Sequence, residues 1–210
     1  MSGLFITFEG GEGGGKSTQI EKLKNVLELQ SFDVITTREP GGTPIAERIR
    51  DTLLDPENKS ITPMAELLLY QAARAQHVEE LIIPALEKGS IVLCDRFADS
   101  TAAYQGAGRK LSPHALTILH DLATGGLSPD VTFLLDLPPE TGLARANQEG
   151  TADRIEQESL DFHLRVREAF LNLARNNPDR IHVLDALQPI DDIADHVQAI
   201  IKSVLNERGV

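Results

Sequence analysis

A glycine-rich loop near the start of the chain has the residue types and spacing of a phosphate-binding site. It consists of Gly10, Gly11, Glu12, Gly13, Gly14, Gly15, Lys16 and Ser17. These residues fit the P-loop pattern G-x-x-x-x-G-K-[ST], in which backbone N–H groups point at phosphate oxygens and a Cβ would crowd them. Lys16 would supply a positive charge for the β- and γ-phosphates, and Ser17 a hydroxyl for Mg²⁺. The loop therefore predicts a site for nucleotide phosphates.

The glycine loop lies between a predicted strand and a predicted helix, as a phosphate-binding P-loop requires. Leu4–Phe8 is a short apolar, β-prone run, and Lys16–Gln30 repeats apolar residues at helical spacing. Strand, glycine loop and helix form the context in which the motif binds phosphate. The alternative is a flexible glycine-rich turn, which would need neither neighbour.

A second polar pair follows the apolar run Ile91–Cys94. Asp95 comes directly after this run, and Arg96 follows it. In P-loop enzymes a carboxylate at such a strand end holds the water shell of Mg²⁺. The planar donor fork of Arg96 suits bidentate phosphate binding. The alternatives are a turn-forming Asp and a surface salt bridge, and the nearby P-loop favours the phosphate site.

Two further groups of side chains could bind a nucleobase. Tyr70 and Arg74 lie four residues apart on a predicted helix, so one could stack on a base and the other could hydrogen-bond its edge. Spacing alone favours a Tyr at the edge of the core and a solvated Arg. A polar cluster follows Arg96, and an ordinary helix start is its alternative. This cluster consists of Ser100, Thr101, Tyr104 and Gln105.

A polar stretch with one glycine lies between Arg145 and Arg154. Its composition predicts a mobile flap, or lid, at approximately 142–154. An arginine on a closing flap can neutralise charge on a phosphoryl group during transfer. A solvated loop is the alternative.

Apolar runs alternate with amphipathic stretches along the whole chain. The predicted strands are Leu4–Phe8, Asp33–Thr37, Ile91–Cys94, Val131–Leu135 and Ile181–Leu184. The predicted helices are Lys16–Gln30, Pro44–Leu54, Pro63–Leu81, Pro113–Thr124, Pro139–Asn147, Leu160–Asn176 and Ile190–Asn206. This order predicts an α/β fold with a five-stranded parallel sheet and helices on both faces. Ligands of such a sheet bind beyond the carboxyl ends of the strands.

Composition narrows the class of protein. The chain has 210 residues, 41% of them apolar and 25% charged, which suits one globular domain over 1–210. A net charge of −12 disfavours a nucleic-acid partner, although the 20 Lys and Arg residues allow a local anion site. One cysteine fits a reducing compartment. Because neither a signal peptide nor an apolar run of about 20 residues is recognisable, we expect a cytoplasmic protein without a membrane partner.

Four segments together carry a resemblance to a known family. They are Phe8-Glu9-Gly10 through Lys16-Ser17-Thr18, Thr37 through Thr43, Asp95-Arg96-Phe97 with Ser100 through Gly106, and Asp153-Arg154-Ile155-Glu156. In order and spacing the chain resembles the bacterial thymidylate kinases of the P-loop nucleoside-monophosphate kinase group. The resemblance covers nearly the whole chain and is far more specific than the P-loop alone.

The resemblance implies a donor site for ATP and Mg²⁺. The glycine loop, Thr18 and Gln188 would bind ATP, and Ser17 and Asp95 would serve the metal ion. Loops near Arg145 and Gln188 would flank adenine. The implied catalytic residues are Lys16, Asp95, Arg96, Arg145 and Arg154.

The resemblance also implies an acceptor site for dTMP. Arg96 and Arg50 would grip the acceptor phosphate, with help from Arg38. Tyr70 stands where relatives carry a Phe that stacks on thymine, and Tyr104 matches an aromatic residue that crowds the sugar 2′ position. The remaining implied dTMP-binding residues are Glu12 near the sugar hydroxyl, Ser100, and Arg74, Thr101 and Gln105 around the base edge.

The lid is where the chain departs most from the family pattern. The P-loop carries no arginine, so the helper arginine is expected in the lid. Asn147 and Glu149 occupy positions where relatives often carry Arg, which leaves Arg145 and Arg154 as the candidates. The sequence does not decide between them.

The implied activity is transfer of the γ-phosphoryl group of ATP to dTMP, giving ADP and dTDP for dTTP synthesis. The alternatives are a P-loop kinase for another nucleotide or nucleoside and, in a different class, a P-loop ATP-binding switch. The resemblance implies a homodimer formed through helices from the middle of the chain. The sequence does not predict whether the Glu39-Pro40 peptide bond is cis.

Overall fold

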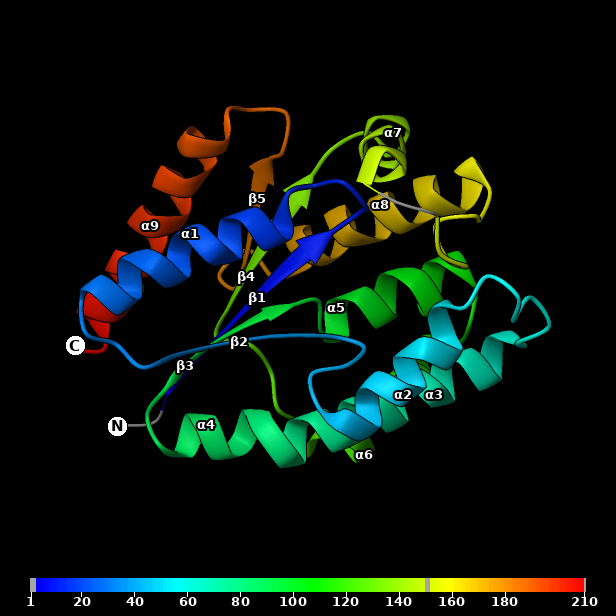
Figure 1. Cartoon of the computed structure of the whole chain (residues 1–210), viewed down its shortest axis with the longest axis horizontal. Helices are drawn as coiled ribbons and strands as arrows, with labels where there is room; N and C mark the ends of the chain where they lie inside the picture. The colour runs from blue at the N-terminus through cyan, green and yellow to red at the C-terminus, as the bar shows by residue number, and fades with distance from the viewer. Residues whose placement is uncertain (1–2, 150–151, 210) are drawn as a thin grey trace.

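The chain folds around a parallel sheet whose order brings the glycine loop to its centre (Figure 1). The computed structural model describes residues 3–149 and 152–209. Within these ranges the sheet has five strands in the order β2-β3-β1-β4-β5. Their bounds are β1 Leu4–Gly10, β2 Val34–Arg38, β3 Ile91–Asp95, β4 Val131–Asp136 and β5 Ile181–Asp185. The predicted α/β fold with a five-stranded parallel sheet is confirmed.

Helices cover both faces of the sheet, as predicted. The α-helices are α1 Lys16–Leu29, α2 Pro44–Leu54, α3 Pro63–His77, α4 Ile83–Glu87, α5 Ala98–Thr101, α6 Pro113–Thr124, α7 Pro139–Glu149, α8 Leu160–Asn176 and α9 Ile190–Glu207. Two π-helical segments are η1 Val78–Ile82 and η2 Ala102–Gly108. None of the described helices is long and apolar enough to cross a membrane.

The central strand β1 is buried on both faces because each face packs on different helices. Leu4, Ile6 and Phe8 join a cluster with residues of α1 and α9, whereas Phe5 packs with residues of η1 and α4. Figure 1 shows α1 and α9 together, apart from α2, α3, α4 and α6. Side chains that alternate along a strand point to opposite faces, so a continuous apolar run is what this position requires.

The helix predicted over 63–81 continues further than its pattern suggested. It passes through η1 into α4, which carries Pro84 near its start and ends at Glu87. Proline lacks an N–H and its ring clashes with the carbonyl group four residues earlier. The wider π turn before Pro84 accommodates both effects, so the chain stays helical. The segment 98–108, for which the sequence left helix as one possibility, is helical as α5 and η2.

Register brings the chemically active residues to one edge of the sheet. Asp95 at the end of β3 lies opposite Phe8 of β1 on one side and Arg38 of β2 on the other. The glycine loop leaves β1 at the same edge. The Glu39-Pro40 peptide bond, which follows β2, is cis.

Candidate active site

Two adjoining cavities open at the carboxyl edge of the sheet. The larger one, of about 700 Å³, runs along the glycine loop, and we call it the donor cavity. The smaller one, of about 160 Å³, lies between α2, α3 and the α5–η2 segment, and we call it the acceptor cavity. The residues that line both are Glu12, Glu39, Arg50, Arg96 and Glu156. Shared walls mean that ligands in the two cavities would meet near Glu12 and Arg96.

Close packing explains why the loop is rich in glycine. Gly10 has a φ of 131°, and a Cβ there would collide with the carbonyl oxygen of Leu135. Gly13 has a φ of 62°, and its Cβ would collide with the carbonyl oxygen of Gly142 in α7. Only glycine fits both the backbone conformation and the space at these positions.

Lys16 is the first residue of α1 and is largely buried beside the loop. Its Nζ donates a hydrogen bond to the carbonyl oxygen of Gly11 at 2.8 Å. Burial and the positive charge of Arg96 lower the pKa of Lys16, while Asp95 and Glu12 act in the opposite direction. An anion held at the start of α1 would stabilise the charged lysine and would meet the free N–H groups of the first helical turn.

Ser17 and Asp95 lie together at the edge of the donor cavity. The Ser17 hydroxyl donates to Asp95 Oδ2 at 3.1 Å. The other carboxylate oxygen, Oδ1, is buried and has no hydrogen-bond partner among the described residues. No cluster of three or more metal-binding side chains occurs in the described part of the chain. Mg²⁺ binds through one or two protein oxygens together with waters and substrate phosphates, so this pair fits the ion.

Arg96 occupies the junction of the two cavities in a strained backbone conformation with a φ of 69°. Its Nη1 donates to the carbonyl oxygen of Gly10 at 2.7 Å, and its Nη2 donates to Glu12 at 2.7 Å. Tyr104 donates its hydroxyl to the same Glu12 oxygen at 2.9 Å. Burial opposes ionisation of Glu12, but Arg96 and Lys16 outweigh it and hold the pKa of Glu12 at about 2. Left-handed strain of this kind is common at functional sites.

Glu9, which is fully buried at the end of β1, anchors the segment that carries Arg96. Its carboxylate accepts hydrogen bonds from the backbone N–H groups of Phe97 and Ser100 at 2.8 and 3.2 Å, and from the Ser100 hydroxyl. Burial and the nearby Asp99 raise the pKa of Glu9 to about 7. The start of α5 is thereby fixed to the central strand.

The acceptor cavity collects most of the residues predicted to bind the second nucleotide. Those that line it are Glu12, Arg50, Tyr70, Arg74, Arg96, Ser100, Thr101, Tyr104 and Gln105. The Thr101 hydroxyl is buried without a hydrogen-bond partner among the described residues, so it is available to a ligand. Arg38 lies instead on the donor cavity, where it pairs with Glu47 at 2.9 Å.

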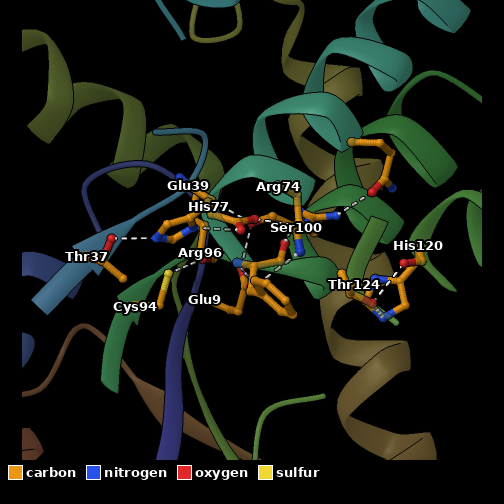
Figure 2. A network of polar contacts seen from close by, with 12 residues as sticks. Glu9, Thr37, Glu39, Arg74, His77, Cys94, Arg96, Ser100, His120 and Thr124 are labelled. Atoms are coloured by element: carbon orange, nitrogen blue, oxygen red, sulfur yellow. Dashed lines mark hydrogen bonds and ion pairs between the residues drawn. The ribbon is translucent and has the colours of Figure 1, made fainter. Parts of the chain in front are cut away.

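A buried network of polar contacts joins α3 to β2 and to the loop that follows β2 (Figure 2). Glu39 accepts from Arg74 at 2.7 Å and pairs with His77 Nδ1 at 3.0 Å, and His77 Nε2 meets Thr37 at 2.7 Å. The neighbouring Pro40 carbonyl oxygen accepts from Arg50 at 2.9 Å. Arg74 and Arg50 are therefore held by adjacent residues of one loop.

The two arginines predicted for the lid lie in different surroundings. Arg145 lines the donor cavity and donates to the carbonyl oxygens of Gly13 and Ala186 at 3.3 and 3.2 Å. Arg154 is 7% exposed, pairs with Glu66 at 2.7 Å and donates to the carbonyl oxygen of Leu53 at 2.7 Å. Two buried acceptors thus hold the Arg154 guanidinium, and Arg154 lines neither the donor nor the acceptor cavity.

The structure describes only part of the predicted lid and of the loops expected near adenine. Gln188 and Thr18 line the donor cavity as expected. The lid range 142–154 includes residues 150–151, which lie outside the described residues, as does the side chain of Glu149. The part of the range up to Glu149 belongs to α7.

The sequence patterns assigned no role to several residues that support the site. They are Glu9, Glu39, Glu66, His77 and Arg109, all with side chains buried or largely buried. Glu66 could have been noticed, because it lies one helical turn before Tyr70 on the same face of α3. The partners of Glu39 and Glu9 come from distant parts of the chain, and no local pattern indicates them.

Comparison with known proteins agrees with the geometry of the two cavities. The family model described as thymidylate kinase matches residues 8–197. A thymidylate kinase of Deinococcus radiodurans is 52% identical over 207 residues, covering 99% of this chain and 98% of that protein. One of Pseudomonas entomophila is 51% identical over 205 residues, covering 98% of each.

A solved structure agrees with these sequence matches. The crystal structure of thymidylate kinase from Ehrlichia chaffeensis has a TM-score of 0.79 at 33% identity and covers 96% of this chain and 100% of that one. The likeness therefore extends over nearly the whole of both chains. The chain belongs to the thymidylate kinase family.

Proposed function

We propose that the chain transfers the γ-phosphoryl group of ATP to dTMP, forming ADP and dTDP in dTTP synthesis. The observation that carries this proposal is the meeting of two cavities at Glu12 and Arg96. One of them has a phosphate-binding loop and the other has an aromatic ring with polar groups around it. The relatives with about 50% identity over nearly the full chain are thymidylate kinases, which supports dTMP as the acceptor.

On the donor side, the loop amides and Lys16 hold the β- and γ-phosphates of ATP. Phosphoryl transfer needs alignment and neutralisation of charge more than covalent chemistry from the protein. Lys16 and Arg96 supply positive charge from two sides of the junction. We assign no general base, because the acceptor atom is already an anionic phosphate oxygen.

Ser17 and Asp95 would hold Mg²⁺ at the donor phosphates, with Ser17 as a ligand and Asp95 acting on the water shell. When bound, the ion neutralises negative charge on the β- and γ-phosphate oxygens. The unpartnered Oδ1 of Asp95 supports this assignment.

On the acceptor side, Arg96 and Arg50 grip the phosphate of dTMP, because both line the cavity that the two nucleotides share. Tyr70 stacks on the base, and Arg74, Thr101 and Gln105 surround its edge. Tyr104, held against Glu12, closes the space beside the sugar. Arg38 approaches the phosphates from the donor side.

For the lid we assign the contact with the donor nucleotide to Arg145 and leave Arg154 a supporting role. Arg145 already lies over Gly13, next to the end of β5. Gln188 lines the same cavity and would flank adenine with it.

The test is a coupled assay of ADP release with ATP and a panel of nucleoside monophosphates. The proposal expects turnover that depends on an acceptor and is fastest with dTMP. Preference for another monophosphate would identify a different P-loop kinase, and ATP turnover without any acceptor would identify a switch. Either result would contradict the proposal.

Homodimer formation through α3 and α6 is a further part of the proposal. Apolar side chains are exposed on both helices, namely Met64 and Leu68 on α3 and Ile118 and Leu122 on α6, with Leu122 78% exposed. Such a patch on adjacent helices suits a copy of the same chain. Light scattering should give the mass of a dimer for the wild type and of a monomer for Leu122→Glu with Leu68→Glu. A cytoplasmic location remains a prediction from the sequence.

A further inference from the structure

Glu66 lies beneath the acceptor cavity and takes no direct part in the mechanism above. It is fully buried on α3, one helical turn before Tyr70. A buried carboxylate is costly to retain unless it is paired and hydrogen-bonded. Its partners therefore indicate what it does.

Three side chains from two distant segments donate hydrogen bonds to Glu66. Gln105 Nε2 donates to Oε1 at 2.9 Å. Arg109 donates from Nε to Oε1 at 3.0 Å and from Nη2 to Oε2 at 2.9 Å. Arg154 Nη1 lies 2.7 Å from Oε2. Of these partners only Gln105 lines the acceptor cavity.

Glu66 is ionised in this environment. Burial opposes its ionisation, but the hydrogen bonds of Arg109 and Gln105 outweigh burial and lower the pKa of Glu66. An ionised carboxylate only accepts hydrogen bonds. The group of Gln105 that faces it must therefore be the NH₂, whichever way the amide would otherwise turn.

This constraint leaves the carbonyl oxygen of Gln105 for the cavity. That oxygen has no hydrogen-bond partner among the described residues, whereas the NH₂ is engaged with Glu66. Arg74, on the same cavity, can only donate. Arg74 and Gln105 together offer a donor and an acceptor to a base.

We propose that Glu66 is a positioning residue that selects the base by fixing the amide of Gln105. The inference rests on the proposed function. Thymine presents a carbonyl oxygen next to a ring N–H, which complements a donor next to an acceptor. Cytosine presents an amino group next to an unprotonated ring nitrogen, which reverses the pattern. With the Gln105 amide fixed, the amino group of cytosine faces the donor Arg74 and its ring nitrogen faces the carbonyl oxygen of Gln105. Neither pair can form a hydrogen bond, and buried polar groups without partners lower affinity strongly.

The test compares kcat/KM for dTMP and dCMP in wild type and Glu66→Gln. A neutral amide at 66 both donates and accepts, so Gln105 can turn either way. We expect the preference for dTMP over dCMP to fall about tenfold or more, with the KM for ATP unchanged. The ratio of the equilibrium affinities for the two monophosphates should fall in parallel.

Two further variants separate positioning from a merely structural role. Gln105→Ala leaves Glu66 and both arginines in place and should show the same loss of preference. In the double variant, Glu66→Gln should then add nothing to Gln105→Ala. Arg109→Lys, which disturbs Glu66 without touching Gln105, should keep the preference of the wild type.

An unchanged dTMP preference in Glu66→Gln or in Gln105→Ala would overturn the inference, as would equal effects of Glu66→Gln with and without Gln105. If Glu66→Gln does not fold, an unchanged dTMP preference in Gln105→Ala still overturns the inference. Failure of the wild type to phosphorylate dTMP would instead overturn the proposed function. The binding ratio would still test Glu66 in that case.

Discussion

The donor and acceptor cavities are built in different ways, although they share a wall. The longest continuous part of the donor cavity's wall is one segment, 12–19, whose loop depends on backbone groups and glycine conformations. The acceptor site is assembled from α2, α3, the α5–η2 segment and the stretch after α7. Its shape depends on buried charges such as Glu39 and Glu66.

This difference predicts how each site fails. Removing the Lys16 side chain from the donor site takes away a contact to phosphate and leaves the fold intact, because its hydrogen bond goes to the carbonyl oxygen of Gly11 in the same loop. A substitution in the acceptor network leaves a charge buried and unpaired, which destabilises the fold as well as the site. Variants on the two sides should therefore separate loss of activity from loss of stability.

The largest expected effect is that of Lys16→Ala on the donor side. Removing a positioned charge from the transferring phosphates should lower kcat by about two to three orders of magnitude, with little change in the thermal unfolding midpoint. Steady-state kinetics and calorimetry measure the two quantities. Lys22→Ala, on the same helix in an exposed pair with Asp191, is the matched control and should remain close to wild type. Activity of Lys16→Ala within a few-fold of wild type would refute the donor role.

The two arginines near the lid give the next largest contrast. Arg154→Ala should lower the free energy of unfolding by about 2 kcal/mol, because Glu66 loses a buried partner. Arg145→Ala should leave stability unchanged and lower kcat/KM for ATP about tenfold. Urea unfolding and kinetics on both variants check the contrast. If Arg154→Ala changed only the kinetics with ATP and left stability unchanged, the prediction would be contradicted and Arg154 would be a catalytic residue.

On the acceptor side, Tyr70→Ala should raise the KM for dTMP about tenfold or more, because stacking on an aromatic ring contributes roughly 1–3 kcal/mol per base. The KM for ATP should change little. Tyr70→Phe keeps the ring and serves as control, with a KM for dTMP within a few-fold of wild type. Equal changes in the two KM values for Tyr70→Ala would contradict base stacking.

The last expected effect is a change of stability with pH and concerns Glu9, beneath the junction of the two sites. Its pKa is raised from 4.5 to about 7, so between these values the folded chain keeps a proton that the unfolded chain has lost. This residue's contribution to stability therefore decreases as pH rises through that window and is constant above it. Glu9→Gln cannot lose a proton, so its free energy of unfolding relative to wild type should rise from pH 5 to about 7.

Urea unfolding at a series of pH values measures that difference. Glu12→Gln is the control, because the pKa of Glu12 lies at about 2 and its relative stability should be flat across the same window. Parallel curves for wild type and Glu9→Gln would show that Glu9 does not titrate there.

The same contrast explains what the sequence could and could not predict. Strands, helices and the glycine loop follow from local patterns, and these patterns predict the phosphate-binding part of the donor site. The helix beyond Leu81 was missed because Pro84 normally ends a helix, and the π turn that accommodates it has no simple sequence signal.

Spacing offered several acceptor residues only as one alternative, the resemblance implied their roles, and the residues that support them were not predicted. Arg154 was one of two candidates for the helper arginine, and its buried pairing with Glu66 could not be predicted because Glu66 lies far away in sequence. His77 and Glu39 contact each other over a separation of 38 residues. Such pairs form only when α3 packs beside β2, so they depend on the whole fold rather than on a motif.

The most direct test of phosphoryl transfer between two nucleotide sites uses ATP with an isotope label in its γ-phosphate and measures which product receives the label. With dTMP present, the wild type should transfer the label to dTDP, and little should appear as inorganic phosphate. Tyr70→Ala at low dTMP should slow labelling of dTDP while ATP still binds. Label released mainly as inorganic phosphate, at a rate that does not depend on dTMP, would contradict the account.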